Sequence, residues 1–367
     1  MPQYFRRTIL ILLPFLPLIS CGEETPVTTS SPPVPVPVVE ISGQASYPFA
    51  VGYTGASDTG SYAAVVYNPD GTVQDVFGFG KRVVDVQLQP TGNYTACVSE
   101  GETMSAFLEF TPAGEVVNRY ESQTTPETGV HELRLYPDGS SLLYGVIRPT
   151  LDMSSYGGWD SAEIKHCIVE YTRPDGSLFT WSTVDGMDYD DSYNHYQGSP
   201  VNPYHINAID RDVDGNLLIS LRHACQVVKV NSQTGEVMWR LGGKRSDFTF
   251  VDDPLNGFSR QHGIRRLANG NIILFNNGND YIPPRSRAIE YSLDEQTMTA
   301  RLVWEYQDTT FALAMGFADR LPNGNTLICY GTAQVIREVT PEGNVIFEMR
   351  TLSGELPYRA IHISNTE

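Results

Sequence analysis

Three of the seven histidines precede a turn glycine by similar distances in this 367-residue chain. The spacings are 8 residues for His131 and Gly139, 10 for His205 and Gly215, and 8 for His262 and Gly270. Equivalent positions in successive repeats occupy equivalent places in a repeat fold. We therefore expect the three imidazoles to converge at one end of a central channel.

Two further polar residues accompany His205. Arg222 lies 7 residues after Gly215, on the return strand of the same hairpin, so we expect it beside His205. Asn207 is two residues past His205 and is predicted to point to the same side of its strand. The remaining histidines lack this spacing and are expected to be structural, and His223 is expected to face away from Arg222; they are His166, His195, His223 and His362.

Two kinds of chemistry use such residues. Three imidazoles make a good zinc set, but an arginine in the cluster repels a cation and no carboxylate shares the spacing. Alternatively, Arg222 offers a planar donor fork to a sulfate or phosphate group, and Asn207 adds a neutral donor. A neutral histidine can attack sulfur or phosphorus while a second protonates the leaving oxygen. The residue types favour transfer of a tetrahedral oxyanion, without a cofactor, over metal-dependent hydrolysis.

Two interleaved series of glycine-containing turns indicate the β-hairpins that position these residues. The first series contains Gly92, Gly139, Gly215, Gly270 and Gly324, and the second contains Gly71, Gly114, Gly176, Gly235 and Gly343. A missing member of the second series is expected near Asp294–Glu295, and a sixth member of the first in the region 55–60. Two hairpin turns per repeat of about fifty residues indicate a four-stranded blade.

The fold predicted from this repeat is an all-β, six-bladed propeller over residues 41–367. A β-sandwich or jelly roll would not explain the paired periodicity. Extra segments around 149–160 and 183–200 interrupt the third repeat. Because long insertions in compact folds are usually functional loops, we expect the second one to overhang one face of the ring.

Composition narrows the classes of function. The chain has 41% hydrophobic and 11% aromatic residues, which is ample for a core, and 25 basic against 43 acidic residues, a formal net charge of −18. Nucleic-acid affinity rests mainly on neutralising phosphates with Lys and Arg. Nucleic acid is therefore not expected as a partner.

The first forty residues predict export and anchoring. A basic start and a short apolar run broken by proline indicate a signal peptide over 1–20, and Leu18-Ile-Ser-Cys21 resembles the bacterial lipobox. Residues 21–40 are then a lipidated Cys21 and a linker rich in Pro, Ser and Thr. We expect a cell-envelope protein held to the membrane by its lipid alone, favouring the periplasmic face of the outer membrane over the cell surface. The other cysteines, Cys97, Cys167, Cys225 and Cys329, lack CxxC spacing, and their pairing is left open.

Several longer motifs carry a family resemblance. They are Tyr204-His-Ile-Asn207, Leu218-Ile-Ser-Leu-Arg222-His223, Thr234-Gly-Glu-Val-Met-Trp-Arg-Leu-Gly-Gly243, Gln261-His262, Leu274-Phe-Asn-Asn-Gly278, Ser286-Arg287 and Leu321-Pro-Asn-Gly-Asn325. As a set they resemble the bacterial arylsulfotransferase (aryl-sulfate sulfotransferase) family. The similarity is dense from about 200 to 335 and weak before 130.

The resemblance implies a six-bladed propeller that moves a sulfuryl group from a phenolic sulfate ester to a phenol without a nucleotide donor. His262 matches the histidine that becomes transiently sulfated. His205 and Asn207 match the His-x-Asn motif of the family, and Arg222 matches its active-site arginine. His131 matches an upstream histidine, although Glu132 follows it where the family usually has Asp.

Two other functions compete with sulfuryl transfer. A propeller of this kind could bind a ligand or protein at the cell surface without catalysis, or it could be a metal-dependent hydrolase or lactonase. Arg287 is equally compatible with the anion site and with a structural salt bridge.

The anchoring hypothesis makes a direct prediction. Replacing Cys21 by Ala should move the protein from the membrane to the soluble fraction, because a surface this acidic does not bind anionic membranes unaided. Cell fractionation with immunoblotting measures the shift, and Ser20→Ala, which keeps the cysteine, is the control. A Cys21→Ala protein that stays with the membranes contradicts the lipobox interpretation.

Overall fold

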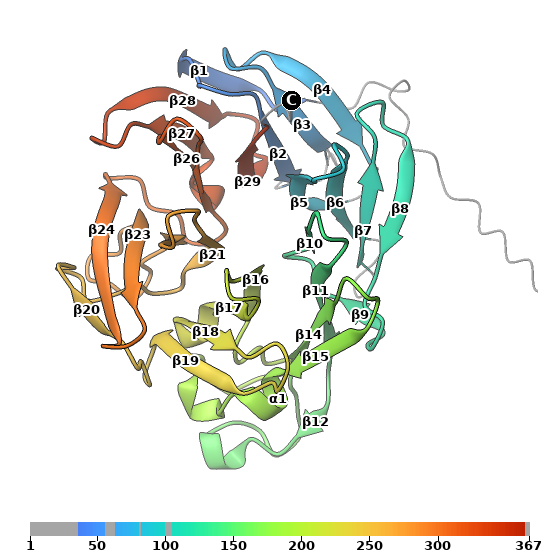
Figure 1. The fold of residues 1–367 in the computed structure, drawn as a ribbon, viewed down its shortest axis with the longest axis vertical. Helices are drawn as coiled ribbons and strands as arrows, with labels where there is room; N and C mark the ends of the chain where they lie inside the picture. Colours follow the sequence, from blue (N-terminus) through green and yellow to red (C-terminus); the bar gives the residue numbers. More distant parts are fainter. Residues whose placement is uncertain (1–35, 56–62, 81, 100–104, 364–367) are drawn as a thin grey trace, which may run out of the picture.

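A computed structural model describes residues 36–55, 63–80, 82–99 and 105–363. Over these residues the chain forms six sheets of four or five strands arranged around a central axis and one further two-stranded sheet, and helix is nearly absent (Figure 1). This confirms the six-bladed propeller. The proposed signal peptide and most of the linker lie outside the described residues.

Each blade has four main strands, ordered here from the innermost to the outermost. Blade 1 contains β29 (Leu356–His362), β2 (Phe49–Thr54), β3 (Ala63–Tyr67) and β4 (Val73–Gly78). Blade 2 contains β5 (Val83–Leu88), β6 (Tyr94–Ser99), β7 (Ser105–Phe110) and β8 (Val116–Tyr120). Blade 3 contains β10 (Arg134–Leu135), β11 (Ser141–Ile147), β14 (His166–Thr172) and β15 (Leu178–Ser182), with β9 (Glu127–Thr128) also paired to β11.

The second half of the ring follows the same plan. Blade 4 contains β16 (Ile206–Arg211), β17 (Leu217–Leu221), β18 (Gln226–Val230) and β19 (Val237–Gly242). Blade 5 contains β21 (His262–Arg266), β22 (Ile272–Asn276), β23 (Arg287–Asp294), β24 (Thr299–Gln307) and a parallel edge strand β20 (Thr249–Val251). Blade 6 contains β25 (Phe317–Arg320), β26 (Thr326–Cys329), β27 (Val335–Val339), β28 (Val345–Thr351) and β1 (Val39–Gly43).

The turn series fall where the repeat predicts them. First-series turns join the innermost pair of strands in blades 2 to 6, and second-series turns join the outer pair, including the turn without glycine after Asp294. Gly139 and Gly270 have φ of +82° and +85°, values that glycine adopts without strain. The prediction of a sixth first-series turn at 55–60 is wrong, because that region connects β2 to β3, and its residues 56–62 lie outside the described part.

Blade 1 has no such turn because the two ends of the chain close the ring. Strand β29 pairs with β2 and becomes the innermost strand of blade 1, while β1 pairs with β28 at the outer edge of blade 6. The C-terminal strand therefore lies beside strands from the start of the propeller (Figure 1).

Neighbouring blades are held together by shared apolar clusters. One cluster joins Trp239 and Leu241 of blade 4 to Ile272 and Leu274 of blade 5. Another joins Phe49 of blade 1 to Phe347 of blade 6, whose rings lie 5.6 Å apart. Burial of apolar surface between the sheets is what stabilises the ring.

The insertions in the third repeat project beyond the ring as a separate lobe. They contain β12 (Thr150–Leu151) paired with β13 (Ala162–Glu163), a short helix α1 (Thr183–Gly186), and the 3₁₀ turns η1 (Ser154–Tyr156) and η2 (Tyr189–Asp191). Two further 3₁₀ turns, η3 (Arg222–Ala224) and η4 (Gly331–Ala333), follow β17 and β26. Over the described residues no helix has the length and apolar character needed to cross a membrane.

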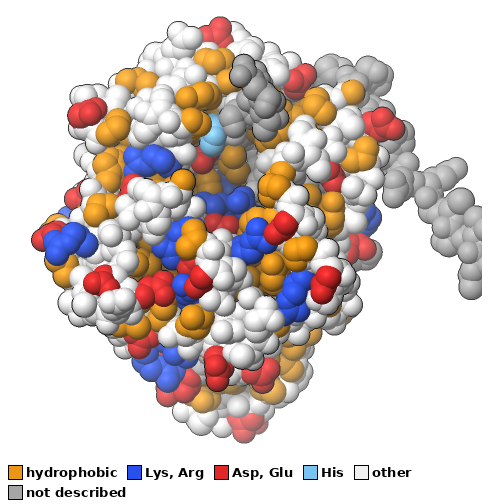
Figure 2. Space-filling view, viewed as in Figure 1, with side chains coloured by type: hydrophobic (Ala, Val, Ile, Leu, Met, Phe, Trp, Pro, Cys, Tyr) orange, Lys and Arg blue, Asp and Glu red, His pale blue; other side chains and the backbone are white. Residues whose placement is uncertain are grey.

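The two ends of the central channel differ in their side chains. The strand ends that carry the predicted histidines lie opposite the turns of both series, so the histidines occupy one end. In the face shown in Figure 2, Lys and Arg side chains gather in the hollow at the centre of the ring.

Candidate active site

The structure brings His131, His205 and His262 together at the axis. The ring centroids of His131 and His205 lie 4.9 Å apart, and those of His131 and His262 lie 6.0 Å apart. His131 and His205 precede β10 and β16, and His262 begins β21, so three consecutive blades supply one imidazole each. The predicted convergence is therefore present in the fold.

A fourth histidine joins this cluster against expectation. The ring of His223 lies 4.8 Å from that of His205, and its Nδ1 donates a hydrogen bond to the carbonyl oxygen of Asn202 at 2.7 Å. The prediction that His223 faces away was wrong because Arg222 and His223 belong to the turn η3, where strand alternation does not apply. Asn202 lies just after the second insertion, and Tyr193 within that insertion donates its backbone N–H to the carbonyl of His223. The second insertion thus reaches the histidine end of the channel.

The tautomer of His262 follows from one hydrogen bond. Its Nδ1 lies 2.8 Å from the carbonyl oxygen of Gly316, which can only accept, so Nδ1 carries the proton. The neutral ring then has its lone pair on Nε2. Burial, reinforced by the nearby charges of Arg359 and Arg222, holds the pKa of His262 well below its usual value.

The other two imidazoles are also kept neutral. Burial lowers the pKa of His131 and of His205 well below the usual value, and the rings disfavour one another's protonation. His205 has a left-handed φ of 53° and is held by a hydrogen bond from its N–H to Oδ1 of Asn202. A non-glycine residue in this region indicates a backbone that the surrounding structure constrains.

Arg222 is the cation of this cluster. Its Nη2 donates to the carbonyl oxygen of Leu313 at 2.9 Å, and its Nε is buried without a hydrogen-bond partner among the described residues. Burial and the neighbouring Arg260 lower its pKa, yet a guanidinium stays charged at any pH of interest. Arg222 therefore retains donor capacity for an anion.

Asn207 lies at an irregular position of β16. The pairing of β16 with β17 is interrupted by a bulge between Ile206 and Ala208, so Asn207 and His205 are not related by simple alternation. Asn207 Nδ2 donates to the carbonyl of Gln261 at 2.7 Å, which fixes the orientation of the amide. Its Oδ1 is fully buried and has no hydrogen-bond partner among the described residues. This hydrogen bond places the amide of Asn207 beside Gln261, the residue that precedes His262.

Tyr358 is a member of the site that sequence reasoning missed. Its hydroxyl lies 2.7 Å from Nδ1 of His131, and its ring contacts those of both His131 and His262, with centroids 5.9 and 5.4 Å away. It belongs to β29, the one innermost strand that is not followed by a first-series turn glycine. No spacing in the sequence relates it to the histidines.

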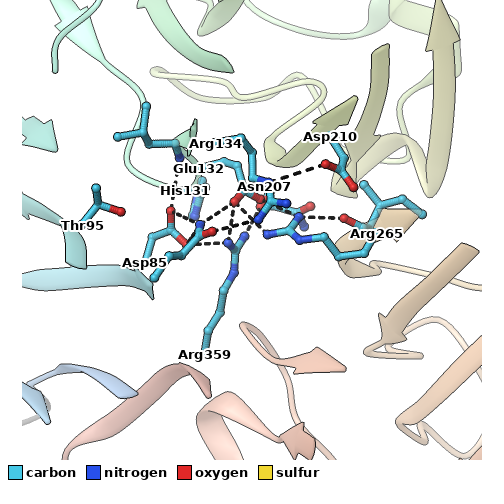
Figure 3. A network of polar contacts seen from close by, with 12 residues as sticks. Asp85, Thr95, His131, Glu132, Arg134, Asn207, Asp210, Arg265 and Arg359 are labelled. Atoms are coloured by element: carbon cyan, nitrogen blue, oxygen red, sulfur yellow. Dashed lines mark hydrogen bonds and ion pairs between the residues drawn. The ribbon is translucent and has the colours of Figure 1, made fainter. Parts of the chain in front are cut away.

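A buried ion network fills the channel next to the histidines (Figure 3). Arg359 Nη1 donates to Asp85 at 2.5 Å and to Glu132 at 3.0 Å, and Arg265 binds Glu132 through both Nη atoms. Arg359, Asp85 and Glu132 are fully buried. Burial opposes ionisation of Glu132, but the two guanidinium groups outweigh it and lower its pKa to about 2.

Two carboxylates of this network have a spacing of their own. Asp85 and Glu132 each lie 7 residues before their turn glycines, Gly92 and Gly139, and so do not share the spacing of 8 or 10 residues that relates the histidines to theirs. A bulge in β5 and a left-handed φ of 51° at Asp85 accompany this position. Neither carboxylate is bonded to a histidine ring, because both are taken up by Arg359, Gln87 and Arg265.

The remaining candidates have structural roles. Arg287 is fully buried and binds Asp253 at 2.9 Å and Glu305 at 2.8 Å within blade 5, so it is a salt-bridge residue and not part of the anion site. Cys97, Cys167, Cys225 and Cys329 are all free and buried. Over the residues that the structure describes, no group of three or more His, Cys, Asp or Glu side chains is arranged to hold a metal ion.

The fold and the site define a six-bladed propeller with neutral histidines and an arginine at one end of its channel. The sequence profile of the arylsulfotransferase (ASST) family matches residues 105–351, which is more than half of the chain. The protein belongs to this family. No curated protein matches the sequence.

Similar solved structures share the overall fold. A protein of unknown function from Bacteroides caccae is 13% identical, with a TM-score of 0.53 over 88% of this chain and 100% of the other. A periplasmic gluconolactonase of Pseudomonas aeruginosa is 13% identical, with a TM-score of 0.49 over 89% and 100%, and a virginiamycin B lyase from Staphylococcus aureus is 11% identical, with a TM-score of 0.45 over 88% and 89%. At these identities the B. caccae structure supports the fold alone.

The ion network predicts a large effect of Arg359 on stability. Replacing Arg359 by Met keeps much of the volume but leaves Asp85 and Glu132 with less compensation, which should lower the free energy of unfolding by about 3–5 kcal/mol. Urea unfolding measures this. The control is Arg301→Met, which breaks an exposed ion pair with Asp252 and should change stability by about 0.5 kcal/mol or less. Equal stability of the two variants would contradict the role of the network.

Proposed function

We propose that this protein transfers a sulfuryl group from a phenolic sulfate ester to a phenol through a transient sulfohistidine at His262. The observation that carries the proposal is the hydrogen bond from Nδ1 of His262 to the carbonyl of Gly316. It leaves the lone pair on Nε2, and the depressed pKa keeps that lone pair free of a proton. Membership of the arylsulfotransferase family supports this chemistry.

The reaction divides into two displacements at sulfur. In the first, the Nε2 lone pair of His262 forms a bond to sulfur while the bond from sulfur to the aryl oxygen breaks, and the phenolate leaves with that electron pair. In the second, the acceptor phenol gives its proton to the neutral imidazole of His131 or His205, and its oxygen forms a bond to sulfur. The N–S bond breaks, and its electron pair returns to Nε2.

The surrounding groups suit the sulfuryl oxygens. Arg222 supplies a guanidinium fork, and Asn207 has a second N–H beyond the one that Gln261 accepts. A negative charge bound beside neutral His131 and His205 raises their pKa values, because the charged imidazole is then favoured. Binding of the donor therefore promotes proton uptake by the groups that assist the leaving oxygen, and preorganised donors meet the shared charge of the transition state.

The rim of the site supplies apolar surface for an aryl ring. Leu313, whose carbonyl accepts from Arg222, is 60% exposed, and Tyr193, whose N–H donates to His223, is 42% exposed. Leu313 lies on the connection from β24 to β25, and Tyr193 lies in the second insertion. An aromatic ester bound between them would place its sulfate toward Arg222 and His262.

The place of action is also part of the proposal. An export signal, Cys21 in a lipobox-like sequence and a proline-rich linker support a lipid-anchored enzyme that works in the cell envelope. Its partners would then be a small aryl sulfate donor and a phenolic acceptor that reach this compartment.

The central experiment is a pulse with the donor alone. With 4-nitrophenyl sulfate and no acceptor, the enzyme should release about one equivalent of nitrophenol, and mass spectrometry of digests kept from acid should find sulfate on the peptide with His262. His262→Asn should give neither signal, while His166→Asn, a histidine of blade 3 bonded to Thr183 and Tyr189, should keep both. An unmodified His262 peptide in enzyme that turns over normally would exclude this residue as the nucleophile.

The role of Arg222 is tested by a substitution that keeps the charge. Arg222→Lys should reduce kcat/KM at least tenfold, because an ammonium group cannot reproduce the planar fork on two sulfuryl oxygens. Steady-state kinetics with a fixed phenol measure the loss, and Arg260→Lys, a neighbouring arginine that pairs with Asp280, is the matched control. Near-normal turnover of Arg222→Lys would assign this residue a structural role.

The pH profile should reflect the buried state of His262. Attack needs the neutral imidazole, and its pKa lies well below the usual value of about 6.5, so the sulfation rate should stay level as pH falls through 6.5 and decline only at lower pH. Single-turnover rates between about pH 5 and 8 measure this, with circular dichroism to verify folding. A decline centred near 6.5 would show that the nucleophile has an ordinary pKa.

A further inference from the structure

A second cavity opens at the end of the channel opposite the histidines. It has a volume of about 300 Å³ and is lined by residues of the innermost strands and their turns. The lining residues are Gln87, Leu88, Arg134, Arg265, Arg266, Leu267, Ile273, Phe317, Ala318, Asp319, Arg320, Ile361 and His362. The Lys and Arg side chains in the central hollow of Figure 2 lie on this face.

The lining of the cavity is strongly cationic in an acidic protein. It includes four arginines, Arg134, Arg265, Arg266 and Arg320, out of 25 basic residues in a chain with a net charge of −18. Their counter-ions are Asp210, Glu132, Asp212 and Glu290, all buried and none among the lining residues. The guanidinium groups thus line the cavity, and the carboxylates lie in the protein interior outside the lining.

The ion pairs of these arginines leave some of their hydrogen-bond donors unused. Glu132 is shared between Arg265 and Arg359, which also pairs with Asp85, and Asp212 is shared between Arg266 and Lys229, which also pairs with Asp214 and Glu295. Arg134 approaches Asp210 only at 3.5 Å, and its Nε is buried without a hydrogen bond among the described residues. Arg320 Nε has no hydrogen-bond partner either. Buried donors without partners cost stability, so a ligand that accepts from them is favoured.

The one lining carboxylate is already engaged. Asp319 accepts hydrogen bonds from the backbone N–H of His362 and from its Nδ1, the latter at 2.7 Å. Burial opposes protonation of His362, but Asp319 outweighs it and raises the pKa of the ring. Asp319 is therefore held at the wall by His362, away from the arginines of the other blades.

The cavity also has apolar walls. Phe317 lies under the guanidinium of Arg265, 4.9 Å from ring centroid to Cζ, and Leu88, Leu267 and Ile361 complete that side. A fully hydrated inorganic ion would leave these walls unused. An anion with an apolar body would bury them while its head group meets the arginines.

We propose that this cavity is a binding site for a small organic anion, with a carboxylate or sulfonate-type head on the arginines and an apolar body against Phe317, Leu88 and Leu267. The Arg359–Glu132–Asp85 network lies between this cavity and the histidines, so it is a separate site. The proposal does not depend on sulfuryl transfer, since it concerns binding alone.

The test is calorimetric titration of the full folded chain with benzoate, with benzenesulfonate and with neutral benzamide. Benzenesulfonate cannot donate a sulfuryl group, because its sulfur is bonded to carbon. Both anions should bind and benzamide should not, and the anions should bind more weakly at high salt. Binding of benzamide as tight as that of benzoate, or no binding of either anion, would overturn the proposal.

A charge placed in the lining locates the site. Leu88→Glu and Leu88→Gln remove the same apolar contact, but only the Glu variant adds a carboxylate beside the arginines. The Glu variant should therefore bind the anions at least tenfold more weakly than the Gln variant, a difference of about 1.4 kcal/mol. Leu267→Glu and Leu267→Gln repeat the comparison from blade 5 if the first pair does not fold. Arg222→Gln, at the histidine end, should bind like the parent. Anion binding lost with Arg222→Gln and kept with both Glu variants would place the ligand at the histidines instead.

Discussion

The charge of Arg359 at the centre of the ring is the constraint on which the rest of this structure depends. Its guanidinium joins Asp85 of blade 2 to Glu132 before blade 3, and it also donates to the backbone carbonyl of Asn207 at 2.9 Å. A buried charge is tolerated only when its partners are held in place. One side chain from the last strand therefore fixes the relative positions of three innermost strands, and the histidines stand at the ends of two of them.

Chemistry and stability make opposite demands on this channel. Burial of the imidazoles keeps them neutral and leaves a lone pair on Nε2 of His262, but in the unfolded chain the same rings bind protons near pH 6.5. Stability is thus lost as pH falls below that value. Arg359 contributes to both properties, since its charge lowers the pKa of His262 and its ion pairs join neighbouring blades. The neutral histidines therefore reduce the tolerance of the fold to acid.

The repeated features of the fold could be predicted from the sequence, whereas the residues on the strand that closes the ring could not. Turn glycines gave the blades, and their spacing to His131 and His262 placed both at the axis. Asp85 and Glu132 each lie 7 residues before a turn glycine, and their role became visible only with Arg359 between them. The bulge in β16 removes the simple alternation from which the side of Asn207 was predicted, and the turn η3 explains why His223 was predicted wrongly. Tyr358 and Arg359 lie on the innermost strand that precedes no first-series turn, so no local pattern pointed to them.

The closure by β29 has a consequence for the order in which the site comes into being. Arg359 and Asp85 are separated by 274 positions in the chain, so their contact cannot form until nearly all of the polypeptide is available. Closing a loop of that length carries an entropy cost that shorter hairpins avoid, and blades 2 to 6 can each assemble from local pairings first. The candidate site is therefore completed last, as a single late event, after the five locally built sheets are already in place. A polypeptide caught partway through synthesis would hold folded blades and an incomplete site.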